Sequence, residues 1–300
     1  FSCPVYEKAK HDNREELMKK RISNIFAVAV ILIGCCVLLY PTISNFLVQR
    51  NSSYAVQTYE SALENMGEDQ KKEALEKARE YNKKIRGKVI AGDPFAGHHD
   101  VEDDEYWEVL NIEENGMMGY IQIPKISVEL PIYHGTKERV LQKGIGHWEG
   151  TSFPVGGSST HSVLTGHRGL PTIDLFSDLD RMTNGDVFYL KILGETLAYQ
   201  VDNIQTVLPE ETESLQVYEG KDYVTLVTCT PYAVNTHRLL VRGIRIPYEE
   251  AVEIAPDTVE YKTWIPLEIK AVLAVAACLG SLGVIYSIYM SRRKRNEKNN

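Results

Sequence analysis

A cysteine and an arginine lie close together in residues 223–243, whose sequence is YVTLVTCTPYAVNTHRLLVRG. The β-branched run Val224–Thr228 predicts a strand that ends at Cys229. Pro231 indicates a loop, after which a second strand returns with Arg238 just inside it. Thiolate is the nucleophilic form of cysteine, and a nearby guanidinium favours thiolate and can hold an oxyanion. The hairpin therefore predicts a catalytic cysteine, with a small buried thiol as the alternative.

A cysteine nucleophile works with a histidine that is seldom adjacent in the sequence. Seven histidines lie beyond residue 90, namely His98, His99, His134, His147, His161, His167 and His237. His167 ends a strand-like run, and glycines on both sides allow a sharp turn that leaves its ring at a rim. His161 lies inside the same run, and alternation along the strand directs His237 away from the face of Arg238. We therefore predict His167 as the base.

Residues 92–97, GDPFAG, predict a loop with glycine hinges, an acid at Asp93 and an aromatic tip at Phe95. An ordinary surface turn is the alternative. The nearby polar cluster of His98, His99, Asp100 and Asp103 has ligand-type side chains, but a metal site needs a fixed geometry that a solvated loop does not supply. We therefore do not predict a metal site at this cluster.

Two apolar segments flank the region that carries these residues. Residues 26–40 and 271–290 contain no charged side chain, and the second is near the length needed to cross a hydrocarbon core of about 30 Å. Lys19, Lys20 and Arg21 precede the first segment, and residues 292–295 (RRKR) follow the second. The excess of positive charge at both ends predicts two membrane spans, with both termini in the cytoplasm and the middle of the chain outside.

Charge and cysteine usage restrict the role of that middle region. The two tails carry +2 and +4 of a total charge of −8, which leaves −14 for the rest of the chain. Such an acidic region is not expected to bind nucleic acid or anionic lipid. Of the five cysteines, Cys229 alone lies between the apolar segments. A single external thiol is a liability unless it is used or deeply buried, which favours catalysis.

The elements that must position these residues are mostly strands. Residues 52–85 have helix-forming composition with a break at Gly67, and predict two helices. From residue 119 to 248, short β-type runs separated by Gly, Pro, Asn and Asp predict an all-β barrel or sandwich. The candidate strands are Tyr120–Ile123, Val128–Tyr133, His161–Thr165, Asp186–Ile192, Glu195–Val207, Tyr223–Cys229 and Leu239–Ile246. A short helix is predicted at Asp174–Met182.

These motifs together resemble the sortases, cell-wall transpeptidases of Gram-positive bacteria. The segment TLVTCTPYAVNTHR (225–238) is similar to the signature of the class C, pilus-assembling branch. Residues 166–169 (GHRG) match its histidine motif, and residues 93–95 (DPF) match its lid. Further segments follow in the family's order: GYIQIPK (119–125), LPIYHG (130–135) and TSFPVGG (151–157). Ala233 departs from the pattern, because glycine is expected there.

The resemblance implies an eight-stranded β-barrel in which Cys229, His167 and Arg238 share one groove. Cys229 would attack the Thr–Gly bond of an LPXTG-like sorting signal in a secreted protein. His167 would protonate the leaving amine and Arg238 would stabilise the oxyanion. A lysine of the next pilin subunit would then resolve the thioacyl intermediate, as in other two-step nucleophilic catalysis. Asp93 would pair with Arg238, and Phe95 would cover the thiol until substrate arrives. No metal or organic cofactor would be needed.

The resemblance and the apolar segments together predict the organisation of the chain. The predicted parts are a cytoplasmic tail (1–21), a transmembrane anchor (22–48), a helical stalk (49–87), a lid loop (88–111), the catalytic β-barrel (112–248), a tether (249–268), a transmembrane helix (269–291) and a basic cytoplasmic tail (292–300). Three other functions stay open: attachment of proteins to peptidoglycan, hydrolysis by a cysteine protease, and a non-catalytic membrane-bound scaffold.

Overall fold

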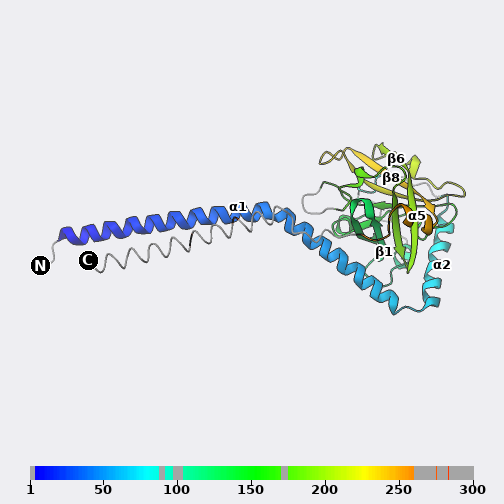
Figure 1. The fold of residues 1–300 in the computed structure, drawn as a ribbon, viewed down its shortest axis with the longest axis horizontal. Helices are drawn as coiled ribbons and strands as arrows, with labels where there is room; N and C mark the ends of the chain where they lie inside the picture. Colours follow the sequence, from blue (N-terminus) through cyan, green and yellow to red (C-terminus); the bar gives the residue numbers. More distant parts are fainter. Residues whose placement is uncertain are drawn as a thin grey trace. The chain divides into compact units, whose positions relative to one another are not determined.

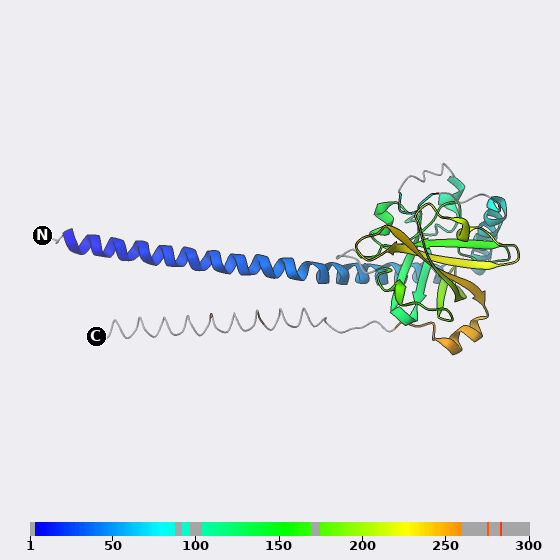
Figure 2. The same ribbon diagram turned by 90° about the horizontal axis from the view of Figure 1, so that it is seen from above.

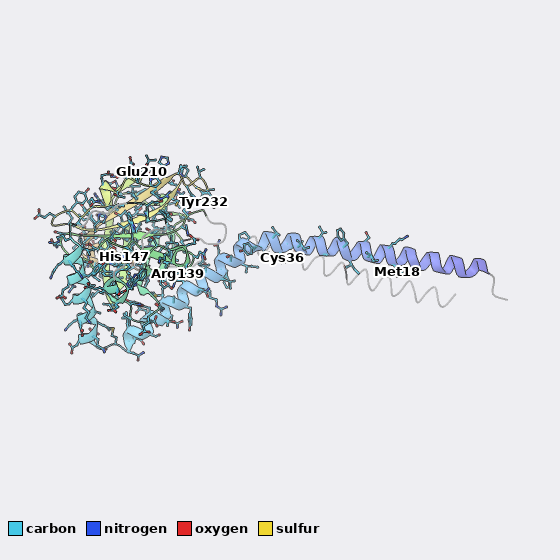
Figure 3. The ribbon with its side chains drawn as sticks, turned by 180° about the vertical axis from the view of Figure 1, so that it is seen from behind. Met18, Cys36, Arg139, His147, Glu210 and Tyr232 are labelled. Carbon is cyan, nitrogen blue, oxygen red and sulfur yellow. The ribbon has the colours of Figure 1, made fainter. Side chains whose placement is uncertain are left out.

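The structure, a computed structural model, describes residues 4–87, 92–96, 104–169 and 175–259 together with Val275 and Gly283. The chain forms two compact units, residues 1–43 with 263–300, and residues 44–262. Helix α1 (Pro4–Glu64) contains the first predicted membrane span, and Met18 and Cys36 mark its first part in Figure 3. Within the described part of the chain, no helix combines the length and the hydropathy that a bilayer span requires. The second predicted span, apart from Val275 and Gly283, lies outside the described residues, as does the basic tail after it.

The second unit is built around a closed barrel of eight strands (Figures 1 and 2). Their order around the barrel is β1-β2-β3-β4-β7-β8-β6-β5, and β5 closes it by pairing with β1. The strands are β1 (Met117–Ile123), β2 (Val128–His134), β3 (Ile145–His147), β4 (Thr160–Thr165), β5 (Val187–Ile192), β6 (Glu195–Val207), β7 (Asp222–Thr230) and β8 (His237–Ile246). The pairs β2·β3 and β4·β7 are parallel and the others antiparallel.

The other helices precede the barrel, join its strands or follow it. Those that precede it are α2 (Glu68–Ile85) and α3 (Asp104–Glu108), those that join its strands are η1 (Pro124–Ile126), α4 (Glu138–Leu141), η2 (Leu179–Arg181) and η3 (Glu213–Leu215), and the one that follows it is α5 (Tyr248–Ile254). The prediction of a mainly β barrel with short helices is confirmed. All seven candidate strands are present, with ends shifted by a few residues. The strand that the sequence did not indicate is β3, whose three residues are too short to show a pattern.

The helices before the barrel pack on it through a few aromatic and polar anchors. The predicted break at Gly67 is confirmed, since Gly67 is the N-cap of α2. Tyr59 of α1 is fully buried; its hydroxyl donates to the carbonyl of Met118 and accepts from the N–H of Leu193. The amide of Asn82 in α2 bonds both the N–H and the carbonyl of Phe153, at 2.7 and 3.1 Å. Both helices therefore pack on the barrel, α1 through Tyr59 and α2 through Asn82.

After β8, α5 begins what the sequence predicts as a tether. Its Ala251 is fully buried, and the Tyr189 hydroxyl donates to the carbonyl of Ala255 just beyond the helix. Lys191 pairs with Asp257 at 2.6 Å. The residues from 248 to 257 therefore belong to the packed body of the second unit.

Two buried histidines make the barrel sensitive to acid. Burial lowers the pKa of His147, labelled in Figure 3, to about 3 and that of His161 to about 4. Each ring bonds protein groups at both nitrogens, with His161 contacting the carbonyl of Gln216 and the hydroxyl of Thr225. The unfolded chain binds these protons near pH 6.5 and the folded chain does not, so stability falls as the pH drops from 6.5 towards 4.

We expect His161 alone to account for a loss on the order of 3 kcal/mol across this range, because each pKa unit corresponds to about 1.4 kcal/mol. Urea denaturation at pH 7.5, 6.0 and 5.0 measures the slope. A His161→Gln variant should reduce this slope. His237→Gln is the control and should leave the slope unchanged, because the His237 side chain is partly exposed at the start of β8. Equal slopes in the parent and the His161 variant would contradict this prediction.

Candidate active site

The strand register sets Cys229 and Arg238 opposite each other. On β7 and β8 they are cross-strand partners, and Val207 of β6 is in turn the partner of Arg238. Alternation directs Leu226 and Val241 into the core and places Cys229 and Arg238 on the outer face of the barrel. The outer face is nevertheless covered here, since the two residues are 7% and 8% exposed. The hairpin predicted from the sequence is therefore present, with thiol and guanidinium on one face.

His167 reaches the same level from the other side of Cys229. Strands β4 and β7 run parallel with Thr165 beside Val227. The pairing continues past the strand end, because Gly166 N–H donates to the Val227 carbonyl at 3.0 Å and the Thr228 hydroxyl donates to the Gly166 carbonyl at 2.7 Å. Because His167 is two residues beyond Thr165 and Cys229 is two residues beyond Val227, the two residues lie at the same level along their chains.

The segment Asp93–Phe95 lies over this row. Both carboxylate oxygens of Asp93 accept from Arg238, from Nε at 2.9 Å and from Nη2 at 2.5 Å. The centre of the Phe95 ring is 5.6 Å from the centre of the His167 ring and 5.0 Å from the guanidinium carbon of Arg238. Pro94 is buried between them in the chain. The expected contact between Asp93 and Arg238 is therefore present, and the aromatic ring lies between the histidine and the arginine.

The covering segment changes the electrostatics of the thiol. Burial raises the pKa of Cys229 above its ordinary value; the positive charge of Arg238 acts in the opposite direction and the carboxylate of Asp93 adds to the rise. With the segment closed, the thiol is held in its protonated, weakly nucleophilic form at neutral pH. Removal of Asp93 and Phe95 from the site would reverse the effects of burial and of the carboxylate.

Glu138, for which no sequence pattern indicated a role, contacts His167. Its Oε2 is 3.1 Å from Nε2 of His167, and its Oε1 accepts from the amide of Gln142 at 3.0 Å. Glu138 begins α4, the helix of Arg139 in Figure 3. A carboxylate at Nε2 favours a proton on that nitrogen, which leaves Nδ1 to exchange protons with a thiol or an amine.

Arg168, the neighbour of His167, is buried and contacts several of the loops around the site. Its Nε donates to the carbonyl of Ser177 at 3.1 Å and its Nη2 pairs with Asp180 at 2.5 Å. The guanidinium also lies over the ring of Tyr232, an exposed residue of the β7–β8 loop labelled in Figure 3. In the same loop Ala233 has φ of 62°, a conformation that favours glycine, so the residue that departs from the expected pattern occupies a strained position.

The other histidines are not part of this arrangement. His134, His147 and His161 are buried and hydrogen-bonded to main-chain carbonyls, and His237 contacts the hydroxyl of Thr236. The polar cluster of residues 98–100 and 103 lies outside the described residues. In the part of the chain that is described, no three His, Cys, Asp or Glu side chains are grouped as a metal site would need.

Known proteins are similar to this chain in sequence and fold. A family described as Sortase domain matches residues 121–246. Sortase C1 of Streptococcus agalactiae is 51% identical, with a TM-score of 0.59, over 65% of this chain and 98% of that structure. A Streptococcus pneumoniae Sortase C, studied for catalysis and pilin substrate specificity, is 44% identical, with a TM-score of 0.59, over 65% of this chain and 97% of its own.

The chain belongs to the sortase family. A curated relative, Sortase A of Bacillus anthracis, is 26% identical over 227 residues, which is 75% of this chain and 95% of that protein. Sortases are cysteine transpeptidases, and this sortase is therefore an enzyme of that kind. Its structural neighbours are sortase C enzymes, in agreement with the resemblance seen in residues 225–238. The roles of the individual residues remain predictions.

We expect removal of the covering segment to expose and activate the thiol of this sortase. Asp93→Ala and Phe95→Ala should each raise the rate of alkylation of Cys229 by iodoacetamide about tenfold, since a partly buried bidentate ion pair or a packed ring is worth roughly 1–2 kcal/mol. The pH at which alkylation is half-maximal should also fall, because the thiol pKa loses the upward effects of burial and of Asp93. Rates measured from pH 6 to 10 test both points.

Asp257→Ala is the matched control, because it breaks an ion pair of similar length between β5 and the segment after α5. Its alkylation rate and pH midpoint should equal those of the parent. If the Asp93 and Phe95 variants also behaved like the parent, these residues would form an ordinary surface turn rather than a lid.

Glu138→Ala is expected to lower turnover by about three- to tenfold, since an exposed carboxylate contributes modestly through one hydrogen bond. The loss should fall on kcat rather than on KM, because Glu138 contacts His167 and is not expected to contact the substrate. Glu138→Gln, which keeps an acceptor oxygen, should restore part of the rate. Glu249→Ala, at an exposed position of α5, should leave both kinetic constants unchanged. An unchanged kcat in Glu138→Ala would contradict a positioning role.

Proposed function

We propose that this sortase polymerises pilin subunits by cleaving LPXTG-like sorting signals between threonine and glycine and joining the new acyl group to a pilin lysine. The observation that carries the proposal is the row formed by Arg238, Cys229 and the level of His167 across three neighbouring strands, under an acid–aromatic segment. Support for the pilin branch comes from identities of 44–51% with sortase C structures over nearly their whole lengths.

Each residue of the row has one chemical task in this proposal. The Cys229 thiolate attacks the threonine carbonyl carbon, and the carbonyl oxygen becomes an oxyanion that accepts hydrogen bonds from Arg238. The C–N bond breaks as His167 donates a proton to the leaving glycine amine, which leaves a thioester on Cys229. The lysine amine then attacks the thioester carbon and gives its proton to His167. The C–S bond breaks, and thiolate and imidazolium are restored.

The proposal includes a membrane location. Residues 22–48 and 269–291 would span the membrane with both termini in the cytoplasm, so that the catalytic domain lies on the outer side with its secreted substrates. This rests on the uncharged segments and the basic residues beside them. Protease protection of the two tails in sealed vesicles tests it, because exposure of either tail on the outer face would contradict the arrangement.

The decisive experiment supplies the purified enzyme with an LPXTG peptide and a recombinant pilin. Mass spectrometry is expected to find a thioacyl adduct on Cys229 and a Thr–Lys isopeptide product. A thioester with no isopeptide, but with transfer to a peptidoglycan stem peptide, would favour the second candidate, attachment of surface proteins to the cell wall. That candidate is kept because curated relatives are named Sortase A. If the only product were the peptide fragment that ends in a threonine carboxylate, the enzyme would be a hydrolase.

A further inference from the structure

The outer face around Cys229 is a regular grid of side chains. Beside the row of Val207, Arg238 and Cys229 lies a second row of Gln205, Leu240 and Val227, and then a third of Asn203, Arg242 and Thr225. Successive rows are two residues apart along the strands, which is about 6.6–6.8 Å. The third row is therefore about 13 Å from the cysteine.

Two of the three side chains in the second row, Leu240 and Val227, are apolar. Leu240 and Val227 pack with Trp148, Val163 and Leu215 in one buried cluster, against which Phe95 and Val207 also lie. In the sorting signal the apolar leucine and proline precede the bond that is cleaved. When Phe95 leaves, this apolar cluster offers a surface for the leucine and proline. A substrate placed in this way runs with its N-terminus towards the third row.

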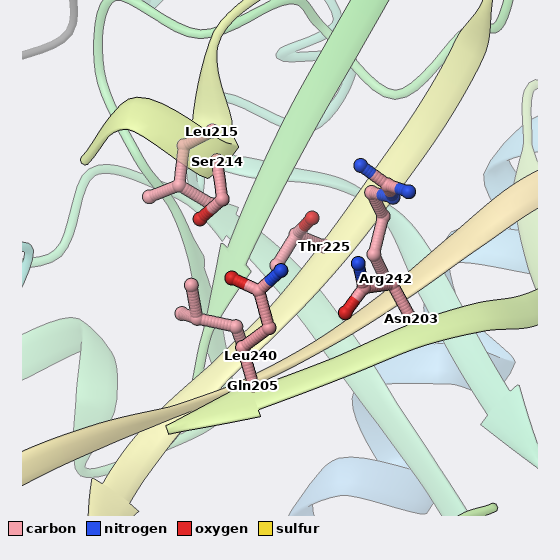
Figure 4. A pocket seen from close by; sticks show the side chains of 7 residues that line it. All are labelled: Asn203, Gln205, Ser214, Leu215, Thr225, Leu240 and Arg242. Atoms are coloured by element: carbon pink, nitrogen blue, oxygen red, sulfur yellow. The ribbon is translucent and has the colours of Figure 1, made fainter. Parts of the chain in front are cut away.

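The third row borders a shallow, partly open hollow in the surface, which we call the upstream notch. Its lining comes from four elements, as Figure 4 shows: Asn203 and Gln205 from β6, Ser214 and Leu215 from η3, Thr225 from β7, and Leu240 and Arg242 from β8. Arg242 is held in place by Asp202, which accepts from Nε at 3.0 Å and from Nη2 at 2.9 Å. The notch thus combines two apolar walls with several polar groups.

Those polar groups have unused hydrogen-bonding capacity. The Ser214 hydroxyl is buried and has no partner within the described chain. The side-chain amides of Asn203 and Gln205, both half-buried, likewise make no hydrogen bond to any described residue. Buried polar groups are normally paired, and each unpaired one costs free energy until a partner arrives. A ligand that offers both donors and acceptors satisfies all three.

We propose that the upstream notch binds the main chain of the substrate just before its sorting motif. The inference rests on the proposed function, since it needs the sorting signal as substrate. With the scissile carbonyl at Cys229, an extended peptide advances about 3.3–3.4 Å per residue, so the fifth residue before the cleaved bond lies level with Thr225 and Asn203. That residue is the one directly before the leucine of LPXTG.

Main chain, rather than a particular side chain, is the ligand that this chemistry fits. A primary amide offers one donor pair and one acceptor, which complement a peptide carbonyl and a peptide N–H. The same protein already contains the arrangement, because the amide of Asn82 bonds both the carbonyl and the N–H of Phe153. The notch would therefore accept varied sequences upstream of the motif while requiring an extended backbone there.

Three peptides test the proposal, each cleaved by enzyme carrying Asp93→Ala so that the lid does not limit access. They are acetyl-LPATG-amide, acetyl-AALPATG-amide, and the longer peptide with an N-methyl group on the alanine before leucine. Hydroxylamine serves as a small acceptor, and kcat/KM is measured by product formation. We expect the unmodified extension to raise kcat/KM about tenfold, the size of one or two hydrogen bonds. The N-methylated peptide should behave like the short one.

The same measurements with Asn203→Ala/Gln205→Ala should bring the ratio of long to short peptide close to one. Gln200→Ala is the matched control, since its amide lies on the same strand and contacts the Gly185 carbonyl instead. The alkylation rate of Cys229 verifies that each variant is folded. A long-to-short ratio of kcat/KM near one in the parent, or an undiminished ratio in the double variant, would contradict the notch proposal. Cleavage of the peptides would still support the proposed sortase function in that case. If no peptide forms a thioester in the parent, the proposed substrate is wrong and the notch proposal falls with it.

Discussion

Cys229→Ala is expected to abolish formation of the thioacyl intermediate and to lower transpeptidation by more than about 10⁴-fold. The reason is chemical, because both half-reactions in the proposed mechanism pass through a thioester on this sulfur. The substitution removes only one buried atom, and the neighbouring strands β7 and β8 hold their register through main-chain bonds. Mass spectrometry of the enzyme–peptide mixture, followed by assay of the isopeptide product, measures both consequences.

Cys229→Ser is the companion variant, since it keeps the shape of the side chain but lacks a readily formed anion. It should also be inactive, and circular dichroism of both variants should match the parent. Residual transfer in Cys229→Ala above about one part in 10³ would exclude Cys229 as the nucleophile. A search of the remaining described nucleophiles would then be needed.

The parts of the site that the sequence predicted are those that local chain geometry brings together. Cys229 and Arg238 are joined by one hairpin, so strand alternation alone sets both on one face. The register of β4 against β7 is non-local, yet His167 was distinguishable because glycines bracket it at a strand end. The resemblance to sortases supplied what patterns did not, namely eight strands and the pairing of Asp93 with Arg238 across 145 residues.

Other features had no sequence signal that could have shown them. Glu138 is an exposed acid at the start of a four-residue helix, and only the folded loop places it beside His167. β3 has three residues and pairs in parallel with β2, so neither length nor alternation indicates it. The residues of the upstream notch are polar positions on strands, which look like ordinary solvent-facing positions until η3 closes over them.

The lid and the catalytic row use the same groups for opposite purposes. Nη1 of Arg238 donates to the carbonyls of Asn235 and His237, at 3.0 and 2.9 Å, which fixes the guanidinium. The N–H of Nε and one N–H of Nη2 donate to the carboxylate of Asp93. In the proposed mechanism a substrate oxyanion would need those same donors. Asp93 in the closed segment would therefore hold a carboxylate where the proposed reaction develops negative charge, and it also raises the pKa of the thiol.

Arg238→Ala is expected to lower transpeptidation by about 10²–10³-fold, the usual cost of removing a donor to an oxyanion. Arg238→Lys should recover little, because one ammonium group cannot reproduce two parallel N–H donors held by the main chain. The substitution also releases Asp93, so its effect on the lid must be separated from its effect on the oxyanion. Both Arg238 variants are therefore measured with and without Asp93→Ala.

With Asp93 intact, loss of Arg238 has two opposing effects on the alkylation rate. It releases the lid, which exposes the thiol, and it removes the positive charge that lowers the thiol pKa. In the Asp93→Ala background the lid is already released, and any further loss of transpeptidation on removing Arg238 comes from the reaction itself. We expect the full 10²–10³-fold loss to persist there. If Asp93→Ala restored the activity of Arg238→Ala to that of Asp93→Ala alone, Arg238 would serve only as the anchor of the lid, and the oxyanion would have to be held by other donors.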